Sequence, residues 1–317
     1  MLRWLTECDQ GWPAGMGPLG ALSECKIRIS DAAEAGFDWL QDNLSGLFDA
    51  MALALEVMIE VILALLQDPP NTGWLYDLRR SEIAYLYPPE WHPILMTVIF
   101  VALAYRLHRG WRMPALLAAG LMFIINQGYW EETTESLTLV MAACVVCMGL
   151  GVPIGIGAAH RPRLYAAMRP VLDLMQTLPT FVYLIPAIVF FGIGMVPGLI
   201  ATVIFVLPAP IRLTHLGISS TPVALIEAAD AFGATPRQKL WKVELPYAAP
   251  QIMAALNQTI MLSLSMVVIA ALVGADGLGV PVVRALNQVN TGLGFEAGLI
   301  IVVVAILLDR LLRVQRR

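Results

Sequence analysis

Long stretches without a charged side chain alternate along the chain with short polar segments. Residues 136–159, 174–211 and 247–275 contain no Asp, Glu, Lys or Arg. About 20 helical residues cross a bilayer core that is roughly 30 Å thick. From residue 88 onward the pattern therefore predicts about seven transmembrane helices, at roughly 88–106, 111–130, 136–158, 173–192, 196–216, 248–272 and 293–312.

Glycines mark two special places within these apolar runs. The segment GIGMVPG (192–198) divides the longest run, because Gly and Pro supply a tight turn there. In GLGVPIGIG (149–157), Gly151 and Gly155 stand four residues apart. This spacing predicts that another helix approaches closely at that face.

The composition agrees with a membrane protein. Of 317 residues, 58% are hydrophobic and 14% are charged, and the mean hydropathy is +0.71. Ordinary soluble domains carry about 25% charged residues. We therefore predict an all-α polytopic membrane protein. The first residues, MLRWLTECDQGWPAG, lack an apolar core, so no cleavable signal peptide is expected.

Residues 1–87 differ from the remainder and are predicted to form an N-terminal extension to a membrane domain at 88–317. Their best apolar stretch is FDAMALALEVMIEVILALLQDPP, in which Glu56 and Glu60 share one helical face. This pattern favours an amphipathic helix around 48–67 that lies on the membrane. A true crossing by residues 51–66 remains the alternative.

Basic residues predict the orientation of the spans. Three Arg lie in RLHRGWR (106–112), three in HRPRLYAAMR (160–169) and four in the tail DRLLRVQRR (309–317), and the loop 219–246 carries Arg237, Lys239 and Lys242. With seven spans, all four segments face the same side, which the positive-inside rule identifies as cytoplasmic. The C-terminus is then cytoplasmic, and residues 1–87 lie outside.

The loop 219–246 interrupts the apolar pattern with a predicted helical hairpin. Ser220-Thr221-Pro222 and Thr235-Pro236 each place a hydroxyl cap before a proline, which suits a first helical turn. Gly233 is expected to end the first helix in a left-handed conformation. Ala228, Ala229 and Ala231 would let another surface approach the first helix closely. The alternative interpretation is a solvated loop with helical propensity.

This loop also carries a spaced motif. EAA (227–229) is followed after three residues by Gly233 and after nine more by VELP (243–246). The spacing resembles the signature loop of the membrane subunits of binding-protein-dependent ABC importers, which usually have Ile where this chain has Val243. The resemblance implies the type I ABC importer transmembrane fold.

The same resemblance implies how the loop works. In that family it forms a coupling helix that docks into a groove of a cytoplasmic ATPase subunit. Glu227 would make polar contacts, Ala228 and Ala229 would permit close packing, and Gly233 would supply the bend. The coupling set implied by the motif is Glu227, Ala228, Ala229, Gly233, Ala234, Leu245 and Pro246. Arg237 and Lys239 are possible additional docking charges.

Three further segments narrow the resemblance to one branch of the family. LDLMQTLPTFVYLIPAIVFFGIG (172–194), LPAPIRLTHLGI (207–218) and NQTIMLSLSMVVIAALVGADGLG (257–279) look like permeases that import glycine betaine, proline and choline-like solutes. The resemblance covers about residues 88–312. It implies a bacterial inner-membrane homodimer with two ATPase chains and one extracytoplasmic binding protein. ATP and Mg would be bound by the ATPase, and this chain would need no cofactor.

Polar residues within two predicted spans are candidates for a solute path. They are Gln176, Thr177, Asn257, Gln258, Thr259, Ser263 and Ser265, and Pro179 with Pro186 would bend the fourth span. Hydrogen bonding between helices is the alternative role for each polar residue. The segment 274–292 is expected to be re-entrant and to face the binding protein.

Several chemistries are not predicted. No GxxxxGK[ST] loop is present, the four His lack HExxH spacing, and Cys144 with Cys147 lie inside an apolar run as packing residues. The chain is therefore predicted to be a transport subunit and not an enzyme. Two alternatives remain open: an importer of an amino acid such as histidine or methionine, and an ATP-independent carrier or channel. Ion-coupled carriers are disfavoured because acids within the spans are scarce.

Overall fold

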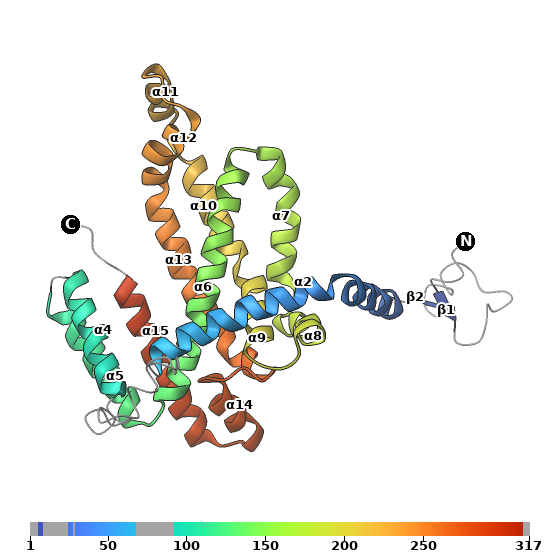
Figure 1. Ribbon diagram of the computed structural model, residues 1–317, viewed down its shortest axis with the longest axis vertical. Coiled ribbons are helices and arrows are strands. Elements are labelled where there is room, and N and C mark those ends of the chain that lie inside the picture. The colour runs from blue at the N-terminus through green and yellow to red at the C-terminus, as the bar shows by residue number, and fades with distance from the viewer. Residues whose placement is uncertain (1–5, 9–24, 28, 68–91, 109, 313–317) are drawn as a thin grey trace. The chain divides into compact units, whose positions relative to one another are not determined.

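The computed structural model describes residues 6–8, 25–27, 29–67, 92–108 and 110–312, and most of these are helical (Figure 1). Part of the first predicted span (88–91) lies outside this range, as do Arg109, Arg313, Arg316 and Arg317. Contacts divide the chain into two units, Met1–Met51 and Ala52–Arg317. In the first unit, β1 (Thr6–Cys8) pairs antiparallel with β2 (Cys25–Ile27), and Cys8 stands opposite Cys25.

Helices follow these strands in chain order. They are α2 (Ile29–Leu66), α4 (His92–His108), α5 (Arg112–Asn126), α6 (Trp130–Ala159), α7 (Pro162–Thr177), α8 (Thr180–Phe191), α9 (Met195–Val206), α10 (Pro208–Ser219), α11 (Val223–Ala231), α12 (Pro236–Lys239), the π-helix η3 (Leu240–Glu244), α13 (Leu245–Ala271), α14 (Gly279–Gln288) and α15 (Thr291–Leu312).

Each of the seven predicted spans has a helical counterpart. Among the described helices, Trp130–Ala159, Met195–Ser219, Pro236–Ala271 and Thr291–Leu311 are long and apolar enough to cross a membrane. The bent pair α7–α8 makes a fifth candidate, whereas α4 and α5 are shorter, with 17 and 15 residues. The prediction of a helical polytopic membrane protein is confirmed, whereas the predicted number of seven spans stays a prediction.

The fourth span takes a different course from the one predicted. The span was predicted at 173–192 with a loop at 160–169, but α7 already begins at Pro162, which suits a first helical turn. Leu178 is extended and Pro179 caps α8, so α7 and α8 meet at 97°. The predicted bend is confirmed at Pro179, whereas Pro186 lies inside α8 without breaking it.

The predicted turn at 192–198 is also present. Gly192 and Gly194 have φ angles of 74° and 142°, which side chains rarely adopt, and α9 begins at Met195. The Gly194 amide donates to the Val273 carbonyl oxygen at 2.9 Å. The turn is thereby tied to the end of α13.

The part of α2 within the second unit packs its apolar face against other helices of the same chain. Ile59 is buried together with Ala142 and Ala143 of α6 and Leu199 of α9, while Glu56 is exposed. The segment predicted at 48–67 is the C-terminal part of this longer helix. Its placement relative to the bilayer stays a prediction.

α10 packs between α6 and α13, and the predicted close approach at Gly151 and Gly155 is confirmed. A Cβ atom added to Gly151 would lie 2.7 Å from Pro210 Cγ, and one added to Gly155 would lie 2.7 Å from the Ile211 carbonyl oxygen. Only glycine fits at these contacts.

We expect Gly155→Ala to destabilise the protein by about 1–3 kcal/mol, because the backbone of α10 has to move. Gly157→Ala is the matched control on the same helix, since no atom lies within 4 Å of its added Cβ. Alanine there should stabilise the helix by up to about 1 kcal/mol. Thermal unfolding in detergent measures both changes, and equal melting temperatures would refute the close contact.

Candidate functional site

The loop 219–246 is a short helix, a glycine joint and a second helix that continues into α13. Figure 1 shows α11 and α12 at the end of α13 that lies away from α14. No residue of α11 is buried. From Pro236 to Ala271 the helical path is 36 residues long, so the second half of the loop and the following span are continuous.

The first helix begins differently from the prediction. Neither Ser220 nor Thr221 caps α11, because Pro222 itself takes the N-cap position with φ −56° and ψ 132°. The Ser220 hydroxyl instead donates to the Gly217 carbonyl oxygen at 2.9 Å. The Thr221 hydroxyl is buried without a partner among the described residues. The cap prediction at this end is wrong because the hydroxyls stand one and two residues too early.

The glycine joint agrees with the prediction. Gly233 has φ 73°, its amide donates to the Asp230 carbonyl oxygen, and the Ala234 amide donates to the Ala229 carbonyl oxygen. These two hydrogen bonds form the Schellman arrangement that ends a helix. No atom lies within 4 Å of a Cβ added to Gly233. The requirement for glycine is therefore conformational and not steric.

We expect Gly233→Ala to destabilise the joint by about 1 kcal/mol and to lower transport, because alanine is strained at this φ. Gly233→Asn is the matched control, since asparagine tolerates the left-handed conformation better. Solute uptake of the two variants in proteoliposomes measures the difference. If Gly233→Ala and Gly233→Asn lost the same amount of transport, the added side chain and not the left-handed backbone conformation would be the cause.

The second helix has the predicted cap. The Gln238 amide donates to the Thr235 hydroxyl at 3.4 Å, and the Thr235 amide donates to Gln238 Oε1 at 2.8 Å. This reciprocal capping box, with Pro236 in the first turn, sets where the continuous helix begins.

An ion pair that the sequence analysis did not single out closes the hairpin. Lys239 Nζ lies 2.7 Å from Asp230 Oδ1 and joins α12 to α11 across Gly233. Both side chains are partly exposed, so the pair contributes at most about 1 kcal/mol. Lys239, a possible docking charge in the sequence analysis, is thus engaged within the loop. The sequence contained a signal for this pair, because Asp230 and Lys239 carry opposite charges on either side of Gly233.

A second missed pair connects the loop to α6. Glu244 is 7% exposed, and its Oε2 lies 2.9 Å from His160 Nε2. The π turn of η3 contains one additional residue, which rotates the following side chains by about 100° around the axis. The other ring nitrogen of His160 lies 2.9 Å from the Ile156 carbonyl oxygen. The two residues are 84 positions apart, so local sequence held no signal for this contact.

The predicted coupling residues gather on one exposed hairpin, with differences in burial. Glu227, Ala228, Gly233 and Pro246 are exposed, whereas Ala229, Ala234 and Leu245 are half-buried. Large apolar side chains that the sequence analysis did not name are also exposed: Val223 (67%), Phe232 (93%) and Trp241 (70%). Exposed apolar residues gathered in one place mark interaction surfaces. The docking role of the hairpin stays a prediction, and these side chains would add apolar area to it.

The predicted path residues divide between two environments. Thr259 and Ser263 are buried within the second unit, and the Thr259 hydroxyl donates to the Ala255 carbonyl oxygen. Asn257 Nδ2 lies 3.4 Å from Asp309 Oδ1 of α15. The remaining members are exposed or half-buried: Gln176, Thr177 and Pro179 near the α7–α8 bend, and Gln258 and Ser265 on α13. Gln258 and Ser265 are seven positions apart and share one helical face.

The re-entrant segment predicted at 274–292 contains α14, whose ten residues are too few to cross a bilayer. Val283, Arg284 and Asn287 contribute to an open hollow of about 310 Å³ beside α13. Val289 follows with φ 51°, an unusual conformation for a β-branched residue.

Comparisons with known proteins identify the family of the chain. The family described as "Binding-protein-dependent transport system inner membrane component" matches residues 151–317. The chain is 44% identical over 287 residues to the glycine betaine transport system permease protein OpuAB of Bacillus subtilis, which covers 90% of this chain and 93% of OpuAB. It is 46% identical over 308 residues to the glycine betaine/proline betaine transport system permease protein ProW of Escherichia coli, covering 97% and 80%.

A solved structure has a similar fold. It is an inward-facing conformation of the MetNI methionine ABC transporter, with a TM-score of 0.52 and 24% identity. The match covers 62% of this chain and 98% of the other. The predicted type I ABC importer fold is confirmed.

Proposed function

Because the chain belongs to the family of binding-protein-dependent transport system inner membrane components, we propose that it carries glycine betaine and chemically related solutes across the membrane in an ATP-driven importer. As a permease it is a transport component of the inner membrane and not an enzyme. Two relatives at 44% and 46% identity are named as glycine betaine permeases, which supports this solute class. Glycine betaine and proline betaine both contain a nitrogen without hydrogen atoms.

The hairpin 219–246 is the coupling element of this proposal. The observation that carries it is the continuous helix from Pro236 to Ala271, which joins an exposed docking surface directly to a membrane span. Displacement of the loop by an ATPase subunit would move α13 as one rigid element. Glu227, Ala228, Ala229, Gly233, Ala234, Leu245 and Pro246 form the coupling set.

The complete importer contains two copies of this chain, two ATPase subunits and one binding protein. ATP and Mg are bound by the ATPase subunits. The basic loops and the C-terminus lie in the cytoplasm, and the N-terminus lies in the periplasm. Gln258 and Ser265, which are exposed on α13, are better placed for the solute path than Thr259 and Ser263, which are buried.

Transport by the reconstituted complex tests the function. The purified chain, its cognate ATPase and its binding protein are placed in proteoliposomes with labelled glycine betaine. We expect uptake to require ATP and all three components. We also expect that histidine and methionine do not compete with glycine betaine for uptake. Uptake by the chain alone would establish a carrier or channel, and competition by an amino acid would establish the other importer class.

A further inference from the structure

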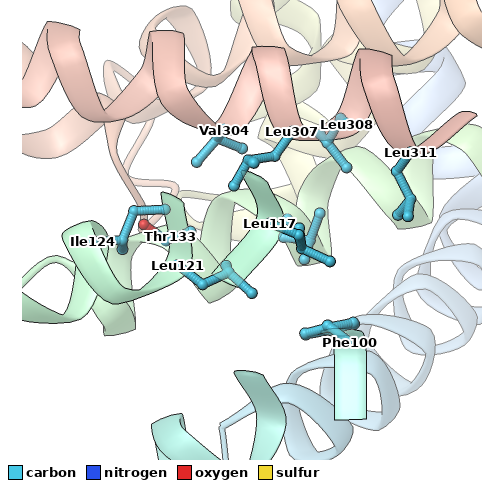
Figure 2. Close-up of a pocket in the computed structure, with 10 residues that line it drawn as sticks. Phe100, Leu117, Leu121, Ile124, Thr133, Val304, Leu307, Leu308 and Leu311 are labelled. Atoms are coloured by element: carbon cyan, nitrogen blue, oxygen red, sulfur yellow. The ribbon is translucent and has the colours of Figure 1, made fainter. Parts of the chain in front are cut away.

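An apolar groove lies between α4, α5, α6 and α15 (Figure 2). Its volume is about 70 Å³, and it is open on one side. The residues that line it are Phe100, Leu117, Leu121, Ile124, Thr133, Leu137, Val304, Leu307, Leu308 and Leu311. Thr133 is the one polar residue among these ten. The lining is thus suited to hydrocarbon.

α5 and α15 are already in contact beside the groove, so they cannot move closer together to close it. A Cβ atom added to Gly120 of α5 would lie 2.8 Å from Leu307 Cδ1 of α15. α5 and α15 therefore already touch at contact distance beside the groove. The space does not close by a simple approach of these two helices.

Three arginines lie beyond or beside the lining residues along their own helices, toward one end of the groove. Figure 2 shows Phe100 and Leu311 toward one end and Ile124 toward the other. Arg310 adjoins Leu311, Arg112 begins α5 five residues before Leu117, and Arg106 follows Phe100 by six residues on α4. At 1.5 Å per residue, Arg112 and Arg106 stand about 8 and 9 Å beyond the lining residues of their helices.

These cations have no internal partner in the part of the chain that the structure describes. Arg106, Arg112 and Arg310 are all exposed, and the ion pairs found among the described residues involve other side chains. Asp309 lies near Arg310 in sequence, but its Oδ1 faces Asn257 of α13. His108 ends α4 at the same end, and both of its ring nitrogens are buried without a described partner.

We propose that this groove binds one acyl chain of a bilayer phospholipid whose anionic headgroup lies against Arg106, Arg112 and Arg310. Guanidinium groups bind phosphate oxygens through paired hydrogen bonds. Basic residues at a cytoplasmic surface attract anionic lipids. The apolar lining and the cationic end match the two parts of such a lipid, in the order in which a lipid presents them.

Photolabelling tests the lipid and its headgroup separately. The full-length chain is reconstituted into nanodiscs that contain phosphatidylglycerol or phosphatidylcholine, each with the same diazirine-bearing acyl chain. We expect adducts on the groove peptides of α5 and α15 to be at least tenfold more abundant with phosphatidylglycerol. Arg112→Gln should lower that preference about fivefold, the contribution of one arginine near a headgroup.

Two variants serve as controls. Leu121→Trp fills the groove and should remove the adducts. If Leu121→Trp does not fold, Arg112→Gln still tests the proposal, because Arg112 is exposed and its replacement leaves the packing intact. Arg163→Gln with Arg169→Gln removes exposed charges from α7, which does not line the groove. Equal labelling by both lipids, or an equal effect of the α7 variant, would overturn the proposal.

Discussion

Arginine in place of Glu227 is expected to uncouple transport from ATP hydrolysis while leaving the chain folded and inserted in the membrane. Glu227 is exposed on α11, so the substitution does not disturb the protein's own packing. Reversing a charge in a docking surface places like charges together and costs several kcal/mol. We expect uptake in proteoliposomes to fall at least 100-fold, with helical content by circular dichroism unchanged.

A bulky residue on the same surface should have a similar effect. Ala228→Trp is the cleaner variant, because Ala228 is exposed whereas Ala229 is half-buried and its carbonyl oxygen accepts the Ala234 amide. Ala119→Trp on the exposed face of α5 adds the same volume away from the loop and should transport normally. If the ATPase still co-purified with both loop variants and still responded to solute, the docking assignment would be wrong.

Alanine in place of His160 is expected to destabilise the contact between α6 and the coupling helix by about 2 kcal/mol, since a hydrogen bond to a charged group is lost. Glu244 is 7% exposed and would keep a carboxylate without this partner. The two ring nitrogens of His160 each lie 2.9 Å from an acceptor atom, Nδ1 from the Ile156 carbonyl oxygen and Nε2 from Glu244 Oε2, so alanine removes both contacts. Unfolding by heat in detergent measures the loss.

A double-mutant cycle separates this pair from general damage. Glu244→Gln, His160→Ala and the double variant are compared, and we expect a coupling energy of about 1–2 kcal/mol. Lys239→Ala, which removes the ion pair with Asp230, is the matched control because the Asp230 carboxylate is much more exposed than that of Glu244. Strictly additive effects of Glu244→Gln and His160→Ala would show that the contact carries no energy.

The elements that local chemistry specifies could be predicted from the sequence. Gly233 ends a helix through its own backbone conformation, and the Thr235–Gln238 box lies within four residues. The apolar helices of the second unit follow from hydrophobicity and length. These features depend on neighbours in the chain and therefore leave a readable pattern.

The features that were missed depend on distant or competing contacts. Pro222 displaced the hydroxyl caps by taking the N-cap position itself. Most of the basic segment at 160–169, which the orientation rule assigned to a loop, is helical from Pro162 onward, because exposed basic side chains are compatible with a helix. The pairing of Glu244 with His160 and the exposure of Phe232 follow from the three-dimensional course of η3, α6 and α11.

The central claim is that the hairpin 219–246 contacts the ATPase inside the cell, and Phe232 offers the most direct measurement. Its side chain is 93% exposed, so a photoreactive phenylalanine analogue can replace it without loss of packing. Phe295 is 75% exposed on α15 and serves as the control. We predict that illumination of cells links position 232 to the ATPase subunit and that position 295 gives no such product. A product that joins position 232 to the extracytoplasmic binding protein would contradict the account.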